Sequence, residues 1–142
     1  MDKIHLIYGP KGCGKTKKLV EIANASVKTA KGVLVYVDKD NSRLHDLAHA
    51  IKLVDTSEYG INTQENLVAF IKGMLAVNYD IEKLFFDGII KIVNKSVEQL
   101  SYLFEQLAKL SQSSGVEFIF TFSYDKKELP DFLQNFNTLY KF

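Results

Sequence analysis

The sequence predicts an α/β fold, a three-layer sandwich whose central sheet is mostly parallel. Continuous apolar runs rich in β-branched and aromatic residues recur along the chain, as is typical of strands buried on both faces. Between them lie stretches whose apolar residues repeat at helical spacing, and this strand–helix alternation indicates a parallel sheet covered by helices. No internal repeat or linker-like tract interrupts the 142 residues, so we expect a single domain spanning residues 1–142.

The expected strands are short, and several of them end at polar or glycine-containing stretches. The first run ends at Gly9, and the second ends in the polar stretch 38–42, where a buried strand would meet its loop. The stretch 52–61 is ambiguous apart from a short strand. The expected strands are, in chain order, 4–8, 33–37, 53–54, 83–88, 116–122 and 138–142.

The expected helices carry apolar stripes and recognisable end signals. The first stripe follows Thr16 and is expected to stop at Gly32, and a further helix is expected at 42–51. Pro130 is expected to start a short helix, and Gly115 to close a longer one. Two longer helices are expected to begin at capping boxes, Asn62 with Glu65 and Ser96 with Gln99.

The stretch between the first strand and the first helix reads G-x-x-x-x-G-K-T, which is the P-loop or Walker A pattern. Its glycines let the backbone curl so that successive N–H groups point at phosphate oxygens, and the following helix directs its positive dipole end at the same anion. Lys15 is expected to reach the β- and γ-phosphates and the Thr16 hydroxyl to complete a Mg²⁺ shell. We therefore predict a nucleotide site, whose residues are Gly9, Pro10, Lys11, Gly12, Cys13, Gly14, Lys15 and Thr16.

A second chemical signal is Asp87, which ends the apolar run 84–86 and so has the Walker B form. If its strand runs parallel to the first, both carboxyl ends lie on the same side of the sheet, where ligands collect in open α/β folds. The carboxylate would then hold Mg²⁺ opposite Thr16. Taken alone, an aspartate followed by Gly88 is also an ordinary start of a turn. We expect Lys15 and Asp87 to be catalytic, and Thr16 and Asp87 to hold the metal.

The net charge, the cysteine count and the lengths of the apolar runs indicate which partners and which compartment to expect. A net charge of +1 supplies no global field toward nucleic acid or an anionic membrane, so neither is indicated. The one cysteine, Cys13, excludes an internal disulfide and fits a reducing compartment. Strand-like sequence begins at Ile4, leaving no room for a signal peptide, and no apolar run approaches membrane-spanning length. We therefore expect a cytoplasmic protein.

Through residues 9–16 and Asp87, the chain resembles P-loop NTPases of the additional-strand division. This division includes RecA-like ATPases, AAA+ proteins and RecA-like thymidine kinases. The resemblance implies that the strand 116–123 lies between the strands of the two motifs, with Thr121 or Ser123 as a sensor of the γ-phosphate. It also implies that the cofactors are ATP and Mg²⁺. The lack of an N-K-x-D guanine motif favours ATP over GTP.

The sequence departs from the family pattern in its catalytic groups. Many hydrolysing members carry a glutamate after the Walker B aspartate, whereas Gly88 follows Asp87 here, so Asp38 and Glu58 are candidate substitutes. Arg43, the only arginine, is either a transition-state finger or an ordinary surface residue. We expect slow hydrolysis that acts through a protein partner or a homo-oligomer. The alternatives are a small nucleoside or nucleotide kinase and a non-hydrolysing, nucleotide-gated regulatory module.

Overall fold

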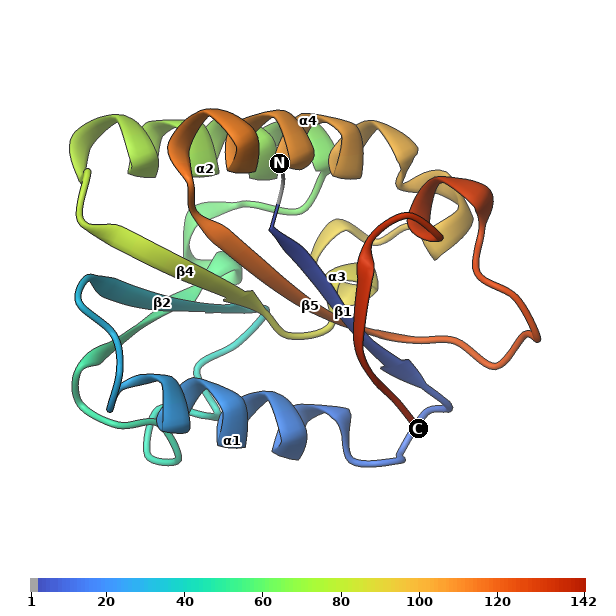
Figure 1. Ribbon diagram of the computed structural model, residues 1–142, viewed down its shortest axis with the longest axis horizontal. Coiled ribbons are helices and arrows are strands. Elements are labelled where there is room, and N and C mark those ends of the chain that lie inside the picture. The colour runs from blue at the N-terminus through green and yellow to red at the C-terminus, as the bar shows by residue number, and fades with distance from the viewer. Residues whose placement is uncertain (1–2) are drawn as a thin grey trace.

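The computed structural model describes residues 3–142, whose strands form one six-stranded sheet (Figure 1). Every strand pair is parallel, and the spatial order is β3-β2-β4-β5-β1-β6. Each predicted strand is present, with its bounds shifted by two residues or fewer. The strands are β1 (Ile4–Gly9), β2 (Val33–Asp38), β3 (Ile51–Asp55), β4 (Ile81–Phe86), β5 (Glu117–Ser123) and β6 (Asn137–Lys141).

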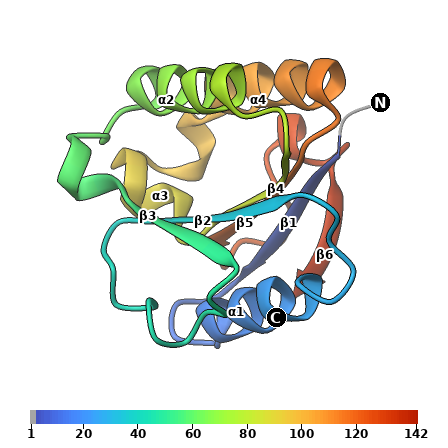
Figure 2. The same ribbon diagram turned by 90° about the vertical axis from the view of Figure 1, so that its left-hand side faces the viewer.

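Helices cover both faces of the sheet, so the predicted three-layer α/β sandwich is confirmed. Figures 1 and 2 show α1 (Lys15–Ser26) on one face and α2 (Gln64–Val77) with α4 (Ser101–Ser114) on the other. The short α3 (Ile89–Val93), which the sequence analysis did not predict, packs into the core on the face of α2 and α4. That core is rich in phenylalanine, because alternate residues of β4 and β5 meet the helices there.

The helix predicted at 42–51 is wrong. Residues 39–50 form a series of turns between β2 and β3. The Asp40 carboxylate accepts hydrogen bonds from the backbone N–H and the hydroxyl of Ser42, at 2.9 and 2.6 Å, which closes an Asx turn at the point where the helix was expected to begin. Short polar side chains that bond to nearby backbone groups compete in this way with helix formation.

Several predicted helix ends also shift. Helix α1 ends at Ser26 instead of continuing to Gly32, and its last residues continue as turns. The capping box of α2 is Thr63 with Asn66, one residue later than predicted. The box at Ser96 forms but opens a short 3₁₀ turn (Val97–Gln99), with α4 following it. The end at Gly115 and the turn after Pro130 (Asp131–Leu133) are as predicted.

The position of β5 matters most for the site. This strand pairs with β1 on one side and with β4 on the other, although both precede it in the chain. The loop after β1 and the residue after β4 therefore lie at the same edge of the sheet, with the end of β5 between them. The predicted placement of 116–123 between the two motif strands is confirmed. Within residues 3–142, the helices are too short or too polar to cross a membrane.

Candidate functional site

The loop 9–16 connects β1 to α1 at the carboxyl edge of the sheet. Gly14 precedes the helix with φ of 102°, a left-handed conformation that a side chain would strain. The hydrogen bond from Lys18 N–H to Gly14 C=O, 3.0 Å long, closes the first helical turn. N–H groups in such a first turn have no acceptor within the helix and form an anion-binding surface.

Gly9 is required by close packing against the end of the chain. A Cβ placed on Gly9 would lie 2.6 Å from Phe142 Cβ and 3.1 Å from Cys13 Sγ. Phe142 is held there by its own N–H, which donates to Tyr8 C=O at 3.0 Å. Figure 1 shows this end of the chain beside the segment that leads into α1. The loop therefore packs against Phe142, the residue that follows β6 beside β1.

Lys15 is folded back onto its own loop. Its ammonium donates to Pro10 C=O at 2.8 Å and lies 3.7 Å from Cys13 Sγ. Cys13 is a free, half-buried thiol within the loop. The ammonium is thus held within its own loop, and of these three residues only Lys15 lines the neighbouring cavity.

Asp87 is the centre of a hydroxyl cage in which three side chains bind one carboxylate. Thr16 and Thr121 each donate to its Oδ1 at 3.1 Å, and Tyr36 donates to its Oδ2 at 2.8 Å. Asp87 is 7% exposed, and hydrogen bonds to a charged acceptor are stronger than neutral ones. The Gly88 N–H in turn donates to the Thr121 hydroxyl at 2.8 Å, which orients that hydroxyl toward the carboxylate.

The parallel sheet explains why these residues meet. Thr16 follows β1, Asp87 follows β4 and Thr121 belongs to β5, so the three approach from adjacent carboxyl ends. Tyr36 was missed as a site residue, since the sequence analysis treated it as core packing. Its ring does pack beside Phe85, with centroids 6.4 Å apart, and only its hydroxyl reaches the cage. The one sign of this role in the sequence was that Tyr36 is the only residue with a polar side-chain group in the apolar run 33–37.

Asp38 ends β2 beside this cage. Burial and the neighbouring charge of Asp87 raise the pKa of Asp38 to about 7, while the hydrogen bond from the Lys39 N–H and the charge of Arg43 partly oppose them. Burial, followed by the charge of Asp87 and its hydrogen bond, also raises the pKa of Tyr36, so the phenol stays protonated and donates. Asp38 therefore changes charge near neutral pH, next to a carboxylate held by three hydroxyl groups.

These groups surround a cavity of about 950 Å³. The expected residues Lys11, Gly12, Gly14, Lys15, Thr16 and Asp87 all line it, and Asp38, Arg43 and Ser123 line it too. The predicted residues Gly9, Pro10 and Cys13 belong to the same loop but are not among the lining residues. Thr121 lines the cavity while its hydroxyl bonds to Asp87. Glu58 is exposed in the turn after β3, outside the lining residues, so it is not placed at the site.

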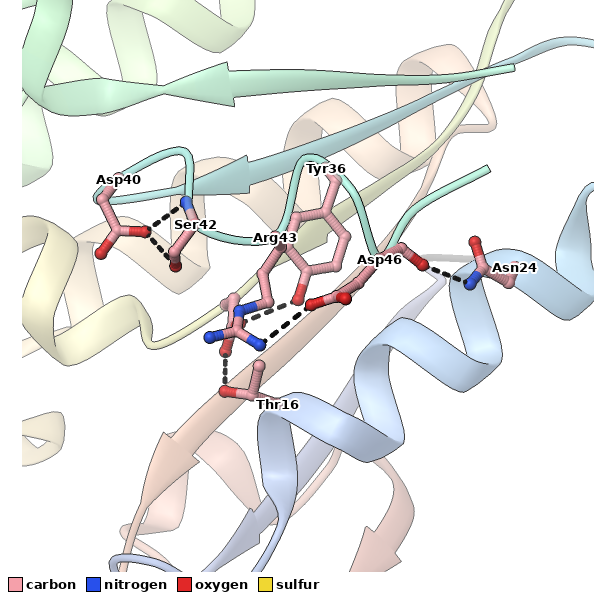
Figure 3. A network of polar contacts seen from close by, with 8 residues as sticks. Thr16, Asn24, Tyr36, Asp40, Ser42, Arg43 and Asp46 are labelled. Atoms are coloured by element: carbon pink, nitrogen blue, oxygen red, sulfur yellow. Dashed lines mark hydrogen bonds and ion pairs between the residues drawn. The ribbon is translucent and has the colours of Figure 1, made fainter. Parts of the chain in front are cut away.

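Arg43 and Asp46 form an ion pair at the cavity wall, with Arg43 Nη1 at 3.1 Å from Asp46 Oδ2. Figure 3 shows both side chains extending from the segment after β2, on the side of Tyr36 and Thr16. Residues from α1 continue the wall away from the loop, including Val20 and Glu21. The cavity thus has a basic end at the loop 9–16 and a mixed wall formed by α1 and the segment 39–50.

Comparisons with known proteins add no family to these observations. No protein-family model matches the chain, and no curated protein matches it.

Proposed function

We propose that this protein binds Mg-ATP through the loop 9–16 and hydrolyses it slowly. The observation that carries the proposal is the hydrogen bond from Thr16 to Asp87, which joins residues 71 apart in the sequence at one end of the cavity. A hydroxyl at the start of a helix and a carboxylate at the end of a parallel strand are the two groups that a P-loop protein places beside Mg²⁺. The position of β5 between β1 and β4 supports the RecA-like division.

The residues of the loop fit a triphosphate. Gly12 and Gly14 line the cavity with positive φ and without a side chain, and the first-turn N–H groups of α1 supply donors. Lys15 would exchange the Pro10 carbonyl for a phosphate oxygen and neutralise part of its charge. The rest of the basic end is formed by Lys11 and Lys17. This clustering favours a polyanion over a neutral ligand.

The oxygen groups beside the loop fit Mg²⁺. This ion binds through one or two protein oxygens and completes its shell with water and phosphate. Thr16 and Asp87 are such a pair, joined by a hydrogen bond of 3.1 Å at the cavity. When bound, Mg²⁺ would neutralise charge on the phosphates, while Tyr36 and Thr121 keep the carboxylate oriented.

Asp38 is the group that would take the place of the missing glutamate. It lies at the cavity beside Asp87, where its carboxylate would accept the proton of an attacking water. The side chain of an aspartate is one methylene shorter than that of a glutamate, which is consistent with slow hydrolysis. Ser123, at the end of β5, is the exposed candidate for sensing the γ-phosphate, because the Thr121 hydroxyl already binds Asp87.

A second candidate function is phosphoryl transfer to a small acceptor. The cavity continues past the loop between α1 and the segment 39–50, where Val20, Glu21 and Asp46 line it. Space of this kind beyond a γ-phosphate would admit an acceptor hydroxyl in place of water. In either case we propose a cytoplasmic protein whose nucleotide state is read by a protein partner or a second copy.

The test is Mg²⁺-dependent phosphate release from ATP and GTP, measured beside calorimetric binding of each nucleotide. We expect binding of ATP and slow turnover, both lost in Lys15→Ala. Lys72→Ala is the matched control, because Lys72 is an exposed lysine of α2 on the opposite face of the sheet. Tight binding without phosphate release would support the kinase or the regulatory module. Failure of both nucleotides to bind would overturn the proposal.

A further inference from the structure

The segment 39–50 has no regular structure, yet one side chain of α1 fixes its position. The Asn24 amide donates to Asp46 C=O at 2.9 Å, and its carbonyl accepts from Ala48 N–H at 2.8 Å. Both polar groups of one side chain thus bind the backbone of the same turn (Figure 3 shows the first contact). Leu47, 7% exposed, anchors the turn in the core on the α1 face.

The fixed turn carries the only arginine of the chain into the cavity wall. Arg43 lies three residues before Asp46, and the Asx turn of Asp40 and Ser42 fixes the corner that precedes it. The ion pair from Nη1 to Asp46 Oδ2 restrains the guanidinium further. A guanidinium has five N–H donors in a rigid fork, so this single bond leaves donors for a second, anionic partner.

Arg43 and Lys15 approach the cavity from different elements. Lys15 enters from the loop 9–16, and Arg43 enters from the segment after β2, which is the strand next to β4. The buried carboxylate of Asp87 and the half-buried carboxylate of Asp38 lie at the same cavity. A phosphate held by the loop would therefore have the Lys15 ammonium on one side and the Arg43 guanidinium on another side of the same cavity. Two cations placed in this way stabilise the charge that develops on a transferring phosphoryl group.

We propose that Arg43 stabilises the transition state of ATP hydrolysis in cis, and that Asn24 is the residue that positions it. This inference rests on the proposed function. In the step, a water oxygen forms a bond to the γ-phosphorus while the bond from that phosphorus to the β,γ-bridging oxygen breaks. The bond electrons leave with ADP, and the water proton passes to Asp38. Arg43 donates to the γ-phosphoryl oxygens, whose charge changes most along this path.

The test compares Arg43→Ala and Asn24→Ala with the wild type in three measurements. These are the Kd for Mg-ATP, the rate of phosphate release, and the Kd for Mg-ADP with aluminium fluoride, which mimics the transferring phosphoryl group. For Arg43→Ala we expect the Kd for Mg-ATP to change by less than about threefold, while turnover and aluminium fluoride affinity each fall by about 100-fold or more. Soluble guanidinium at non-denaturing concentration should restore part of the turnover.

Asn24 needs a readout that a loss of stability would not produce. We expect Asn24→Ala to lower turnover by about tenfold, and the double variant Asn24→Ala, Arg43→Ala to be no slower than Arg43→Ala alone. A merely structural Asn24 would slow both backgrounds equally, and that result would overturn its positioning role. Asn66→Ala is the matched control, since Asn66 also binds the backbone of its own turn but caps α2.

The outcomes separate the two proposals. If the wild type binds Mg-ATP and Arg43→Ala keeps wild-type turnover and aluminium fluoride affinity, the role of Arg43 is refuted and the proposed function stands. If the wild type binds Mg-ATP without measurable turnover, the affinity for Mg-ADP with aluminium fluoride alone tests the role of Arg43. A loss of that affinity in Arg43→Ala then supports the role, and an unchanged affinity refutes it. If the wild type does not bind Mg-ATP, both proposals fall.

Discussion

Replacing Tyr36 by phenylalanine removes one oxygen atom from the hydroxyl cage and leaves the buried ring in place. The lost hydrogen bond, 2.8 Å to Asp87 Oδ2, is buried and has a carboxylate as its acceptor. Hydrogen bonds to charged groups contribute about 1.5–3 kcal/mol to stability. We therefore expect the free energy of unfolding of Tyr36→Phe to fall by about that amount, measured by urea denaturation at pH 7.5 with an unchanged slope on denaturant concentration.

The control and the refutation use two further residues. Tyr8→Phe is the matched control, because Tyr8 is a buried strand tyrosine whose hydroxyl makes no hydrogen bond within residues 3–142, and we expect a change below about 0.5 kcal/mol. A double-mutant cycle of Tyr36→Phe with Asp87→Ala should give a coupling energy of about 1–2 kcal/mol. Additive effects of the two substitutions would show that the hydroxyl does not hold the carboxylate, and the cage would be refuted.

Three further predictions concern the same edge of the sheet. Because the pKa of Asp38 is raised from 3.8 to about 7, its contribution to the free energy of unfolding falls as pH rises between these values. The wild type should therefore lose about 2 kcal/mol of stability over this range in urea unfolding, and Asp38→Asn should remove that loss. A pH profile that is the same in the variant and the wild type would contradict this. Gly9→Ala should lower stability by about 1–3 kcal/mol in the same assay, because its Cβ would meet Phe142, whereas Gly73→Ala, with open space around it on α2, should not. Alkylation of Cys13 should block ATP binding in calorimetry, and labelling unaffected by ATP would count against it.

The elements that the sequence predicts correctly are those whose signals are local. β1, β2, β4 and β5 contain contiguous apolar runs, and the loop 9–16 is a contiguous motif, so their signals do not depend on distant residues. The meeting of Thr16 with Asp87 also followed from the sequence, because parallel strands bring their carboxyl ends to one edge. Only the assumption of parallel pairing was needed, and all strand pairs satisfy it.

The features that the sequence did not predict depend on tertiary contacts. The helix expected at 42–51 gives way to turns that Asn24 holds from another element. Tyr36 reaches Asp87 because β2 pairs with β4 in a register that sets Tyr36 opposite Phe85, and no local pattern reports that register. Arg43 could be named as a candidate but not placed, since its position follows from the same turns.

The insertion of β5 between two earlier strands has a consequence for how the chain folds as it is synthesised. β1 and β4 cannot join one sheet until β5 has left the ribosome, because each pairs with β5 rather than with the other. Until then both strands present unpaired edges, the hazard that parallel, high-contact-order sheets carry during folding. The loop 9–16 is translated before β5, yet the hydroxyl cage beside it closes only when Thr121 arrives. The sheet is thus completed late in synthesis. A nucleotide that binds only when the hydroxyl cage is complete would stabilise only chains whose sheet has already formed.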